Sequence, residues 1–352
     1  MAANKPQAGA AREQSTAPLT TMKAIVQHRY GPPDVLTLGE TGIPAIGDDD
    51  VLIRVHAAGV SYPDGVITRG IPYILRLFAG VRRPRQVIRG SEVAGTVTKT
   101  GASVTDLRPG DEVFGWCGQP GAARGGGGFA EYARCPRTMV ARKPATITFA
   151  QAAALPVSGV TALQAVRDWA GVRLGQQVLV NGASGGVGSF AVQIAKALGA
   201  EVTGVCGTGH TGLVRSLGAG TVIDYTREDF TRGTRRYDVI LDFPHLATHS
   251  LASLRRALTP KGTLIPASNT RNRWIGGFSR ILPARLAAPF MPYRMLAPEM
   301  APNQADLCTL ADLIASGKLT PVIDRTYPLA EAPEAIRSFQ QGHTRGKIVI
   351  TV

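Results

Sequence analysis

Apolar and polar positions follow two different patterns along this chain, and the change lies near residue 150. Between Met22 and about Ala141, short runs alternate apolar with polar residues, as Val51, Ile53 and Val55 do, and Pro and Gly turns separate the runs. Such alternation is typical of strands that bury one face. The first pattern therefore predicts a β-barrel.

After Phe149 the apolar runs become continuous and alternate with helical stretches. Strands are expected at 178–180, 201–206, 221–223, 237–242 and 262–267, and a helix at 187–198, where apolar residues recur at helical spacing. Strands that alternate with helices are typical of βαβ units. This second pattern predicts a doubly wound parallel sheet of the nucleotide-binding type.

The length of 352 residues exceeds the roughly 250–300 residues at which single domains stop growing, so we expect two domains. Helices at 303–316 and 330–341 and strands at 321–327 and 347–352 follow the parallel-sheet pattern and are expected to return to the first domain. The predicted organisation is a disordered tail (1–21), a barrel catalytic domain (22–150), a dinucleotide-binding domain (151–295) and a C-terminal return that completes the catalytic domain (296–352).

Composition excludes several classes of protein. Hydrophobic residues make up 44% and charged residues 18% of the chain, which excludes a disordered chain. The four cysteines form neither a zinc clamp nor a disulfide scaffold, and no signal peptide or membrane span is evident, so a cytoplasmic protein is expected. The Ala-rich tail, with Glu13 as its one acid, leaves targeting to an organelle open.

The net charge of +14 is concentrated in two segments that mix arginine with bulky apolar residues, Ile67–Gly90 and Arg271–Arg294. No nucleic-acid-binding signature accompanies them, so nucleic acid is not an expected partner. Solvated faces, a surface for a small hydrophobic substrate and weak contact with a membrane surface are compatible with these segments. A homodimer is also compatible with the sequence.

The run VLVNGASGGVGSFAVQIAK, at 178–196, contains the chemically most informative motif. It follows a predicted strand and opens a predicted helix, and it holds Ala183-x-Gly185-x-x-Gly188 in the dinucleotide register. Gly185 lets the backbone approach a pyrophosphate, Gly188 lets the helix pack on the strand, and the helix N-terminus offers free N–H groups. We therefore predict a bound dinucleotide.

The same residues also satisfy GxSxG, the nucleophile turn of serine hydrolases. Ser184 would be the nucleophile, with Asp242 and His343 in the chain order that such a triad needs. This alternative leaves the barrel without a role, and the doubled glycine suits a pyrophosphate better.

The second strand of the parallel sheet predicts the type of dinucleotide. NAD-specific proteins place an acid at its carboxyl end, whereas here the strand ends in Cys206. Thr208, His210 and Tyr225 follow as hydrogen-bonding groups without negative charge, so a 2′-phosphate meets no repulsion. NADPH is the predicted cofactor.

The stretches MKAIVQHRYG, VHAAGVSYPDGVITRG, GSEVAGTV, RPGDEVFG, LPVSGVTAL, NGASGGVGSFAVQIAKALGA, GTVIDYT and HTRGKIVITV together resemble the medium-chain dehydrogenase/reductase superfamily, in its zinc-free quinone oxidoreductase branch. The resemblance implies an α/β protein with a GroES-like β-barrel catalytic domain that faces a Rossmann domain across a cleft holding NADPH. It departs from the family at Gly207, where many relatives have serine, and at Ser61, where asparagine is usual.

This resemblance also implies roles for particular residues. The pyrophosphate would lie on Ser184, Gly185, Gly186 and Val187, and the 2′-phosphate at Thr208, His210 and Tyr225. The remaining residues expected along the cofactor are Thr161, His343, Thr344 and Arg345.

Zinc-dependent relatives bind their metal through the cysteine of GxCxxD and the histidine of GHE, where this chain has Ser61 and Ser91. No catalytic metal is therefore expected. His245 and His249 have a spacing that can bind metal, but no third ligand accompanies them in a recognisable pattern.

Without a metal to stabilise an alkoxide, the acceptor itself must delocalise the charge that hydride transfer creates. Quinones and α,β-unsaturated carbonyls do so, and their NADPH-dependent reduction is the predicted reaction; NADP-dependent alcohol or aldehyde redox chemistry is the alternative. Tyr62 is the predicted donor to the enolate oxygen, beside Ser61 and Asp64 in the segment that resembles the substrate pocket of relatives. The two arginine-rich segments are expected to flank the mouth of the cleft.

Overall fold

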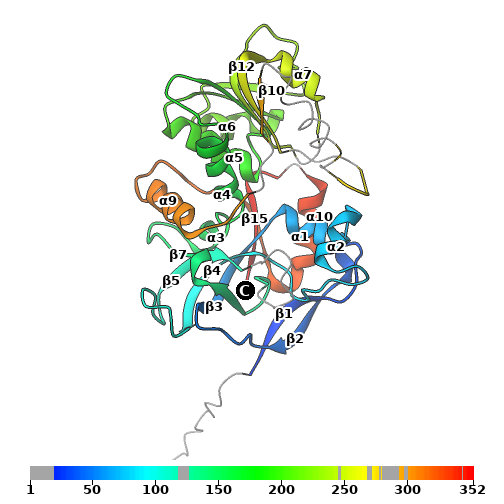
Figure 1. The fold of residues 1–352 in the computed structure, drawn as a ribbon, viewed down its shortest axis with the longest axis vertical. Helices are drawn as coiled ribbons and strands as arrows, with labels where there is room; N and C mark the ends of the chain where they lie inside the picture. Colours follow the sequence, from blue (N-terminus) through cyan, green and yellow to red (C-terminus); the bar gives the residue numbers. More distant parts are fainter. Residues whose placement is uncertain are drawn as a thin grey trace, which may run out of the picture.

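A computed structural model of the chain describes residues 20–117, 127–244, 247–267, 272–276, 279, 293–296, 300–342 and 344–352. Two parts, each built on a sheet, lie one above the other in Figure 1, and strand β15 runs between them. Most of the N-terminal tail predicted at 1–21 lies outside the described residues, and strand β1 already begins at Thr21.

The lower part is β-rich, as the alternating pattern predicts. Its seven-stranded sheet has the order β14-β15-β3-β4-β5-β7, β6 also pairs with β3, and β1 and β2 form a separate pair. Val51, Ile53 and Val55 on β3 are buried in its core. The strands are β1 (Thr21–Gln27), β2 (Leu36–Gly42), β3 (Asp50–Val60), β4 (Glu92–Thr100), β5 (Glu112–Trp116), β6 (Tyr132–Pro136), β7 (Val140–Arg142), β14 (Ile323–Pro328) and β15 (Lys347–Thr351).

The upper part is a six-stranded parallel sheet with the order β10-β9-β8-β11-β12-β13. The strand order reverses direction at β8, and this confirms the predicted doubly wound sheet. Its strands are β8 (Gln177–Asn181), β9 (Glu201–Cys206), β10 (Thr221–Asp224), β11 (Tyr237–Asp242), β12 (Leu258–Pro266) and β13 (Arg294–Met295). Its helices include α4 (Ser158–Leu163), α5 (Gly186–Ala197), α6 (Thr211–Ser216) and α7 (Leu251–Arg256).

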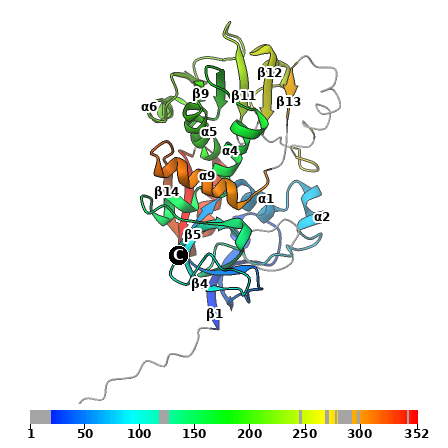
Figure 2. The same ribbon diagram turned by 60° about the vertical axis from the view of Figure 1, so that its left-hand side comes forward.

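The C-terminal residues cross from the parallel sheet back to the barrel. Helix α9 (Gln304–Ala315) packs against α4 and β7, and Figure 2 shows it between the two parts. Strand β15 then pairs antiparallel with β3, with Ile348 opposite Val60. Helix α10 (Ala332–Gln341) packs against β14 and β15 and contacts the short helix α1 (Tyr62–Arg69). The end of the chain is therefore part of the first domain: its last strand extends the barrel sheet, and its last helix contacts α1.

The other described helical elements are short. They are α2 (Arg76–Ala79), α3 (Phe149–Ala153), the π-helix η4 (Gln164–Trp169) and the 3₁₀ turns η1 (Pro33–Val35), η2 (Tyr73–Leu75), η3 (Arg137–Met139), η5 (Thr208–His210) and η7 (Leu329–Glu331).

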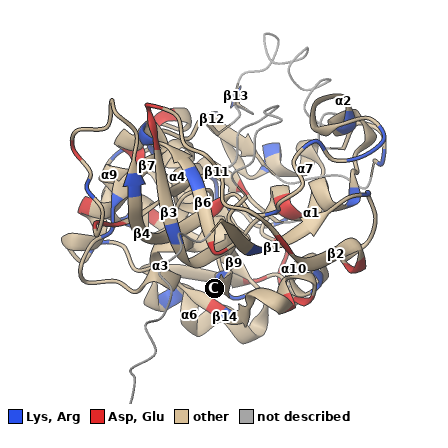
Figure 3. Cartoon of the chain, turned by 90° about the horizontal axis from the view of Figure 1, so that it is seen from below, with Lys and Arg blue, Asp and Glu red and all other residues tan. Residues whose placement is uncertain are grey.

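Two further properties of the described residues are the distribution of their charge and the apolar character of their helices. Seen from below, in Figure 3, basic and acidic positions are interspersed over the described barrel elements. Among the described residues, no helix combines the length and the apolar character needed to cross a membrane.

Candidate active site

A cleft of about 1840 Å³ lies where the two parts meet. Residues from both sheets and from α1, α5 and α10 line it. Arg345 is not among the lining residues, and His343 lies outside the described residues. The predicted site residues that line the cleft are Ser61, Tyr62, Asp64, Thr161, Ser184, Gly185, Gly186, Val187, Gly188, Thr208, His210, Tyr225 and Thr344.

The glycine turn between β8 and α5 forms one wall of the cleft, and its glycines meet different demands. A Cβ atom on Gly188 would lie 2.1 Å from the carbonyl oxygen of Gly182, so the fold itself excludes a side chain there. A Cβ atom on Gly185 would meet only the same oxygen, at 3.4 Å, which is an ordinary contact. The room beside Gly185 is therefore available to a ligand.

This turn fits a dinucleotide. Helix α5 is twelve residues long, and its first N–H groups face the cleft from the turn. Gly346, just before the last strand β15, holds the turn in place by donating its N–H to the Ser184 carbonyl at 2.8 Å. Ser184 to Gly188 are the residues that would hold the pyrophosphate.

The contacts of Ser184 and Asp242 do not form the triad that the serine hydrolase alternative needs. The Ser184 hydroxyl contacts Nδ1 of His210 at 3.0 Å. Asp242 instead accepts a hydrogen bond from the Asn181 amide at 2.8 Å, where β11 and β8 end side by side. Asp242 thus orients an amide in the described chain, which is not what a triad acid does.

The prediction that a 2′-phosphate meets no negative charge at Thr208 is wrong. Thr208 does not stand free of negative charge, because its hydroxyl donates to Asp224 at the end of β10, at 2.6 Å. Three hydrogen bonds from Thr208 and Thr226 lower the pKa of Asp224. Cys206 is buried and carries no charge at this wall, but the neighbouring strand brings in a carboxylate that the sequence reasoning missed.

At the barrel wall, Ser61 and Asp64 are joined at the start of α1. Oδ2 of Asp64 accepts from both the N–H of Ser61, at 2.8 Å, and its hydroxyl, at 3.0 Å. Both bonds join the residue before α1 to the first turn of that helix, so they fix where the helix begins. Burial, followed by the charge of Glu92, raises the pKa of Asp64 to about 6, although the bonds from Ser61 oppose this rise.

Tyr62 is largely shielded from solvent at the same wall, and burial raises its pKa to about 12. The phenol therefore keeps its proton at every physiological pH. A neutral phenol is a good hydrogen-bond donor, whereas complete proton transfer would leave a buried phenolate.

A buried ion pair lies beneath this wall. Nζ of Lys347 on β15 lies 2.6 Å from Glu92 on β4, and these side chains are 3% and 0% exposed. The other oxygen of Glu92 accepts from the N–H of Val157, just before α4, at 2.6 Å. Glu92 therefore joins strand β4 to the C-terminal strand β15 and to the start of helix α4.

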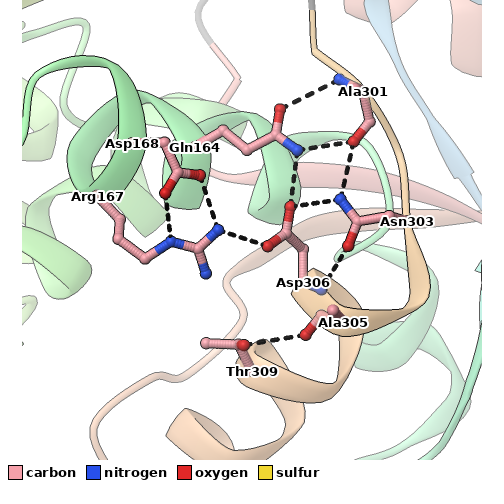
Figure 4. Close-up of polar contacts among 8 residues, drawn as sticks. All are labelled: Gln164, Arg167, Asp168, Ala301, Asn303, Ala305, Asp306 and Thr309. Carbon is pink, nitrogen blue, oxygen red and sulfur yellow. Dashed lines mark hydrogen bonds and ion pairs between the residues drawn. The ribbon is translucent and has the colours of Figure 1, made fainter.

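Met300 lines the cleft although no sequence motif predicts it. Figure 4 shows the contacts of the neighbouring Ala301. The amide of Gln164 bonds both the N–H and the carbonyl of Ala301, at 3.1 and 2.7 Å. Gln164 also donates to Asp306, the buried acid in the first turn of α9, at 2.7 Å. These contacts fix the segment that enters α9 against the helix that follows α4.

The first arginine-rich segment lies at the cleft, as predicted, since Ile74, Leu75 and Phe78 line it. The second segment lies largely outside the described residues, but part of its described portion contacts the first. The N–H groups of Tyr73 and Ile74 donate to the carbonyls of Arg273 and Trp274, at 2.8 and 3.0 Å.

Among the residues raised as metal ligands, His249 lies 3.3 Å from Asp229 and contacts Thr248 at 2.9 Å. His245 lies outside the described residues. No cluster of three or more His, Cys, Asp or Glu that could hold a metal occurs in the described part of the chain.

Two family models match the chain. An alcohol dehydrogenase GroES-like domain matches residues 47–145, and a zinc-binding dehydrogenase model matches residues 217–350. The mitochondrial NAD(P)H oxidoreductase RTN4IP1 of Mus musculus is 31% identical over 377 residues, which cover 95% of this chain and 90% of that protein.

Two further relatives span nearly the whole chain. The chloroplastic NADPH-dependent alkenal/one oxidoreductase of Arabidopsis thaliana is 31% identical and covers 94% of this chain and 79% of its own length. The structure of the quinone oxidoreductase from Coxiella burnetii has a TM-score of 0.80 and 29% identity, with 94% of this chain and 99% of that one covered. Since relatives bear organelle names, they do not confirm the predicted cytoplasmic location.

Proposed function

Because the chain belongs to the medium-chain dehydrogenase/reductase superfamily and is an oxidoreductase that uses a nicotinamide cofactor, we propose a specific reaction for it. It reduces a quinone or an α,β-unsaturated carbonyl with NADPH and without a metal. Bound NADPH would supply a hydride, the acceptor would take up two electrons, and one proton would complete the product. The observation that carries this proposal is that one cleft has the glycine turn from Ser184 to Gly188, the glycine cradle, on one wall and Ser61, Tyr62 and Asp64 on the other.

Independence from zinc rests on the side chains at two positions. Ser61 and Ser91 stand where zinc-dependent relatives have a cysteine and a histidine, and hydroxyl groups are not among the usual zinc ligands. A conjugated acceptor needs no Lewis acid, because its π system delocalises the charge that forms on oxygen.

At this wall, Tyr62 would donate a hydrogen bond to the oxygen on which negative charge develops. Ser61 directs its hydroxyl to Asp64, so it orients the start of α1 and leaves the donor role to Tyr62. Because proton transfer from a phenol of pKa about 12 is unfavourable, the proton itself would come from water, or from Asp64 when that carboxyl is protonated.

The proposal is tested by following NADPH and NADH oxidation over quinones, enones, aldehydes and simple ketones, with and without a chelator. We expect conjugated acceptors to be reduced, chelation to have no effect, and kcat/KM to be at least about tenfold higher with NADPH, a difference of about 1.4 kcal/mol. Cys206→Asp should shift the preference toward NADH. Equal rates with NADH, stoichiometric zinc or turnover only of simple carbonyls would contradict the respective parts of the proposal.

The mouth of the cleft supports a hydrophobic substrate and weak contact with a membrane surface. Phe78 lines the cleft, and it is near Leu77, Val81 and Trp274, which like Phe78 are between 62% and 72% exposed. The exposed Arg82, Arg83 and Arg85 follow in the same segment. Apolar residues surrounded by cations suit an anionic lipid surface. Sedimentation with anionic vesicles that is lost with neutral vesicles is the expected result, and equal recovery with both would contradict it.

A further inference from the structure

Several hydrogen-bonding groups on the barrel wall of the cleft have no partner in the described protein. Six buried side-chain polar atoms lack a hydrogen bond across the described residues, and four of them belong to Arg89, Ser91, Trp116 and Gln340, which all line the cleft. Proteins pair the large majority of such atoms. Their concentration in one cavity indicates a ligand that completes them.

Among these groups, Arg89 needs a partner most, because leaving a buried charge without one costs more free energy than leaving a neutral group without one. It is 3% exposed. One of its terminal nitrogens donates to the Gln86 carbonyl, whereas its Nε has no acceptor in the described protein. Burial lowers the pKa of Arg89 to about 10, so the guanidinium remains charged at neutral pH.

The nearby carboxylates are already engaged by other groups. Glu92 is bound to Lys347 and to the N–H of Val157. Asp64 accepts from Ser61, and it only raises the pKa of Arg89 through space. A buried cation without a bound counter-ion is costly, so an anion entering this corner of the cleft would be stabilised.

The three groups on the barrel strands also share one chemistry. Arg89 and Ser91 precede β4, and Trp116 on β5 lies opposite Glu92, the first residue of β4, so the backbone brings all three to one end of this strand pair. The guanidinium and the indole N–H can only donate, and the serine hydroxyl can donate as well. Their complement is a charged group that only accepts hydrogen bonds.

We propose that Arg89, Ser91 and Trp116 form a subsite for a substrate carboxylate, so that the acceptor is an acidic quinone or enone with an otherwise apolar skeleton. The choice of acceptor rests on the proposed function, whereas the subsite itself does not. A carboxylate is charged throughout the reaction, as is Arg89, whereas an enolate would neutralise the guanidinium only briefly. The apolar Ile67, Ile74 and Leu75 line the same cleft and would contact the skeleton.

The test compares an acidic enone with its methyl ester, in wild type, Arg89→Met and Arg89→Lys. We expect wild type to favour the acid at least about tenfold in KM, Arg89→Met to lose this preference while the ester is little affected, and Arg89→Lys to recover part of it. Arg83→Met removes an exposed cation that does not line the cleft, and it should keep the preference. An unchanged acid-to-ester ratio in Arg89→Met would overturn the subsite.

A binding measurement separates the subsite from the reaction. Octanoate and methyl octanoate are titrated while tryptophan fluorescence is followed, since Trp116 lies at the subsite. Octanoate should saturate in wild type, and its Kd should rise at least about tenfold in Arg89→Met. Thermal unfolding shows whether each variant is folded, and Trp116→Phe provides a second, milder variant read out by turnover.

The outcomes separate the subsite from the proposed function. If octanoate binds but no conjugated acceptor is reduced, the proposed function fails and the subsite stands. If acceptors are reduced but octanoate and the ester bind alike, the subsite fails alone.

Discussion

The two walls of the cleft, which the proposed function assigns to the cofactor and to the substrate and which are named here accordingly, are built from different kinds of groups. The cofactor wall is mainly backbone: the turn from Ser184 to Gly188 and the start of α5, held by Gly346. The substrate wall is mainly side chains, including the charged Asp64, Arg89, Glu92 and Lys347, all nearly fully buried. Backbone N–H groups keep their position when most nearby side chains are replaced. A buried charge, in contrast, destabilises the fold as soon as its partner is removed. We therefore expect the largest mutational effects on stability at the substrate wall.

The strongest test of this contrast is Lys347→Met, which leaves Glu92 charged and unpaired beneath the substrate wall. Removing one partner of a buried pair typically costs about 3–5 kcal/mol, and we expect that loss in the free energy of unfolding. Denaturant unfolding measures it. The control Arg337→Met breaks the solvent-accessible pairs with Asp34 and Glu334 and should cost at most about 1 kcal/mol. Similar losses in both variants would remove the contrast.

Asp64 provides a pH-dependent version of the same comparison. Its carboxyl has a pKa of about 6 in the fold and about 3.9 when unfolded, so the folded state binds more protons between these values. Its contribution to stability is therefore complete below about pH 4 and is lost as the pH rises through 6, by about 3 kcal/mol in all.

Asp64→Asn keeps an acceptor for Ser61 but cannot ionise. Its stability relative to wild type should rise by this amount between pH 4 and pH 8, measured by denaturant unfolding at each pH. A difference that does not change with pH would show that the carboxyl ionises normally.

At the cofactor wall, Gly185→Ala and Gly188→Ala separate binding from folding. A methyl group on Gly185 has room in the protein but occupies the approach of the pyrophosphate, so NADPH should bind at least about tenfold more weakly, a loss of about 1.4 kcal/mol, with an unchanged thermal midpoint. Gly188→Ala collides with the Gly182 carbonyl and should destabilise the fold. Titration of NADPH fluorescence and thermal unfolding give both readouts, and equal NADPH affinity in Gly185→Ala would contradict the cradle.

Tyr62→Phe tests whether a neutral group on the substrate wall acts on the reaction itself. The loss of one positioned donor should lower kcat for enones at least about tenfold and leave the Kd for NADPH unchanged. Quinones should be affected less, because their reduced anions are more delocalised. Wild-type turnover of enones by the variant would assign Tyr62 to packing alone.

The smallest expected effect concerns the charge that approaches the cofactor wall. Asp224→Asn removes a carboxylate beside Thr208, so the ratio of kcat/KM for NADPH to that for NADH should rise about threefold at low salt and less at high salt, as for other exposed charges. Asp312→Asn, on α9, is the matched control. A fall in the ratio would mean that Asp224 does not face the 2′-phosphate.

The sequence by itself determined the two sheets and the glycine cradle. Alternation on β3 and continuous apolar runs in β8 and β11 are local patterns, and each follows from the burial of one face or of both. The turn from Gly185 to Gly188 is equally local, because its shape depends on residues only a few positions apart. Such features can be recognised without knowing what lies next to them in space.

Only the tertiary structure decided which side chains share the cleft. Asp224 reaches Thr208 because β10 and β9 are neighbours, and Lys347 reaches Glu92 across 255 positions of sequence. The sequence also does not reveal that Arg89 is buried with an unbonded Nε, because arginines are mostly exposed in proteins. Charge, burial and the lack of a partner are properties of an assembled neighbourhood, and they arise only when distant strands have been brought together.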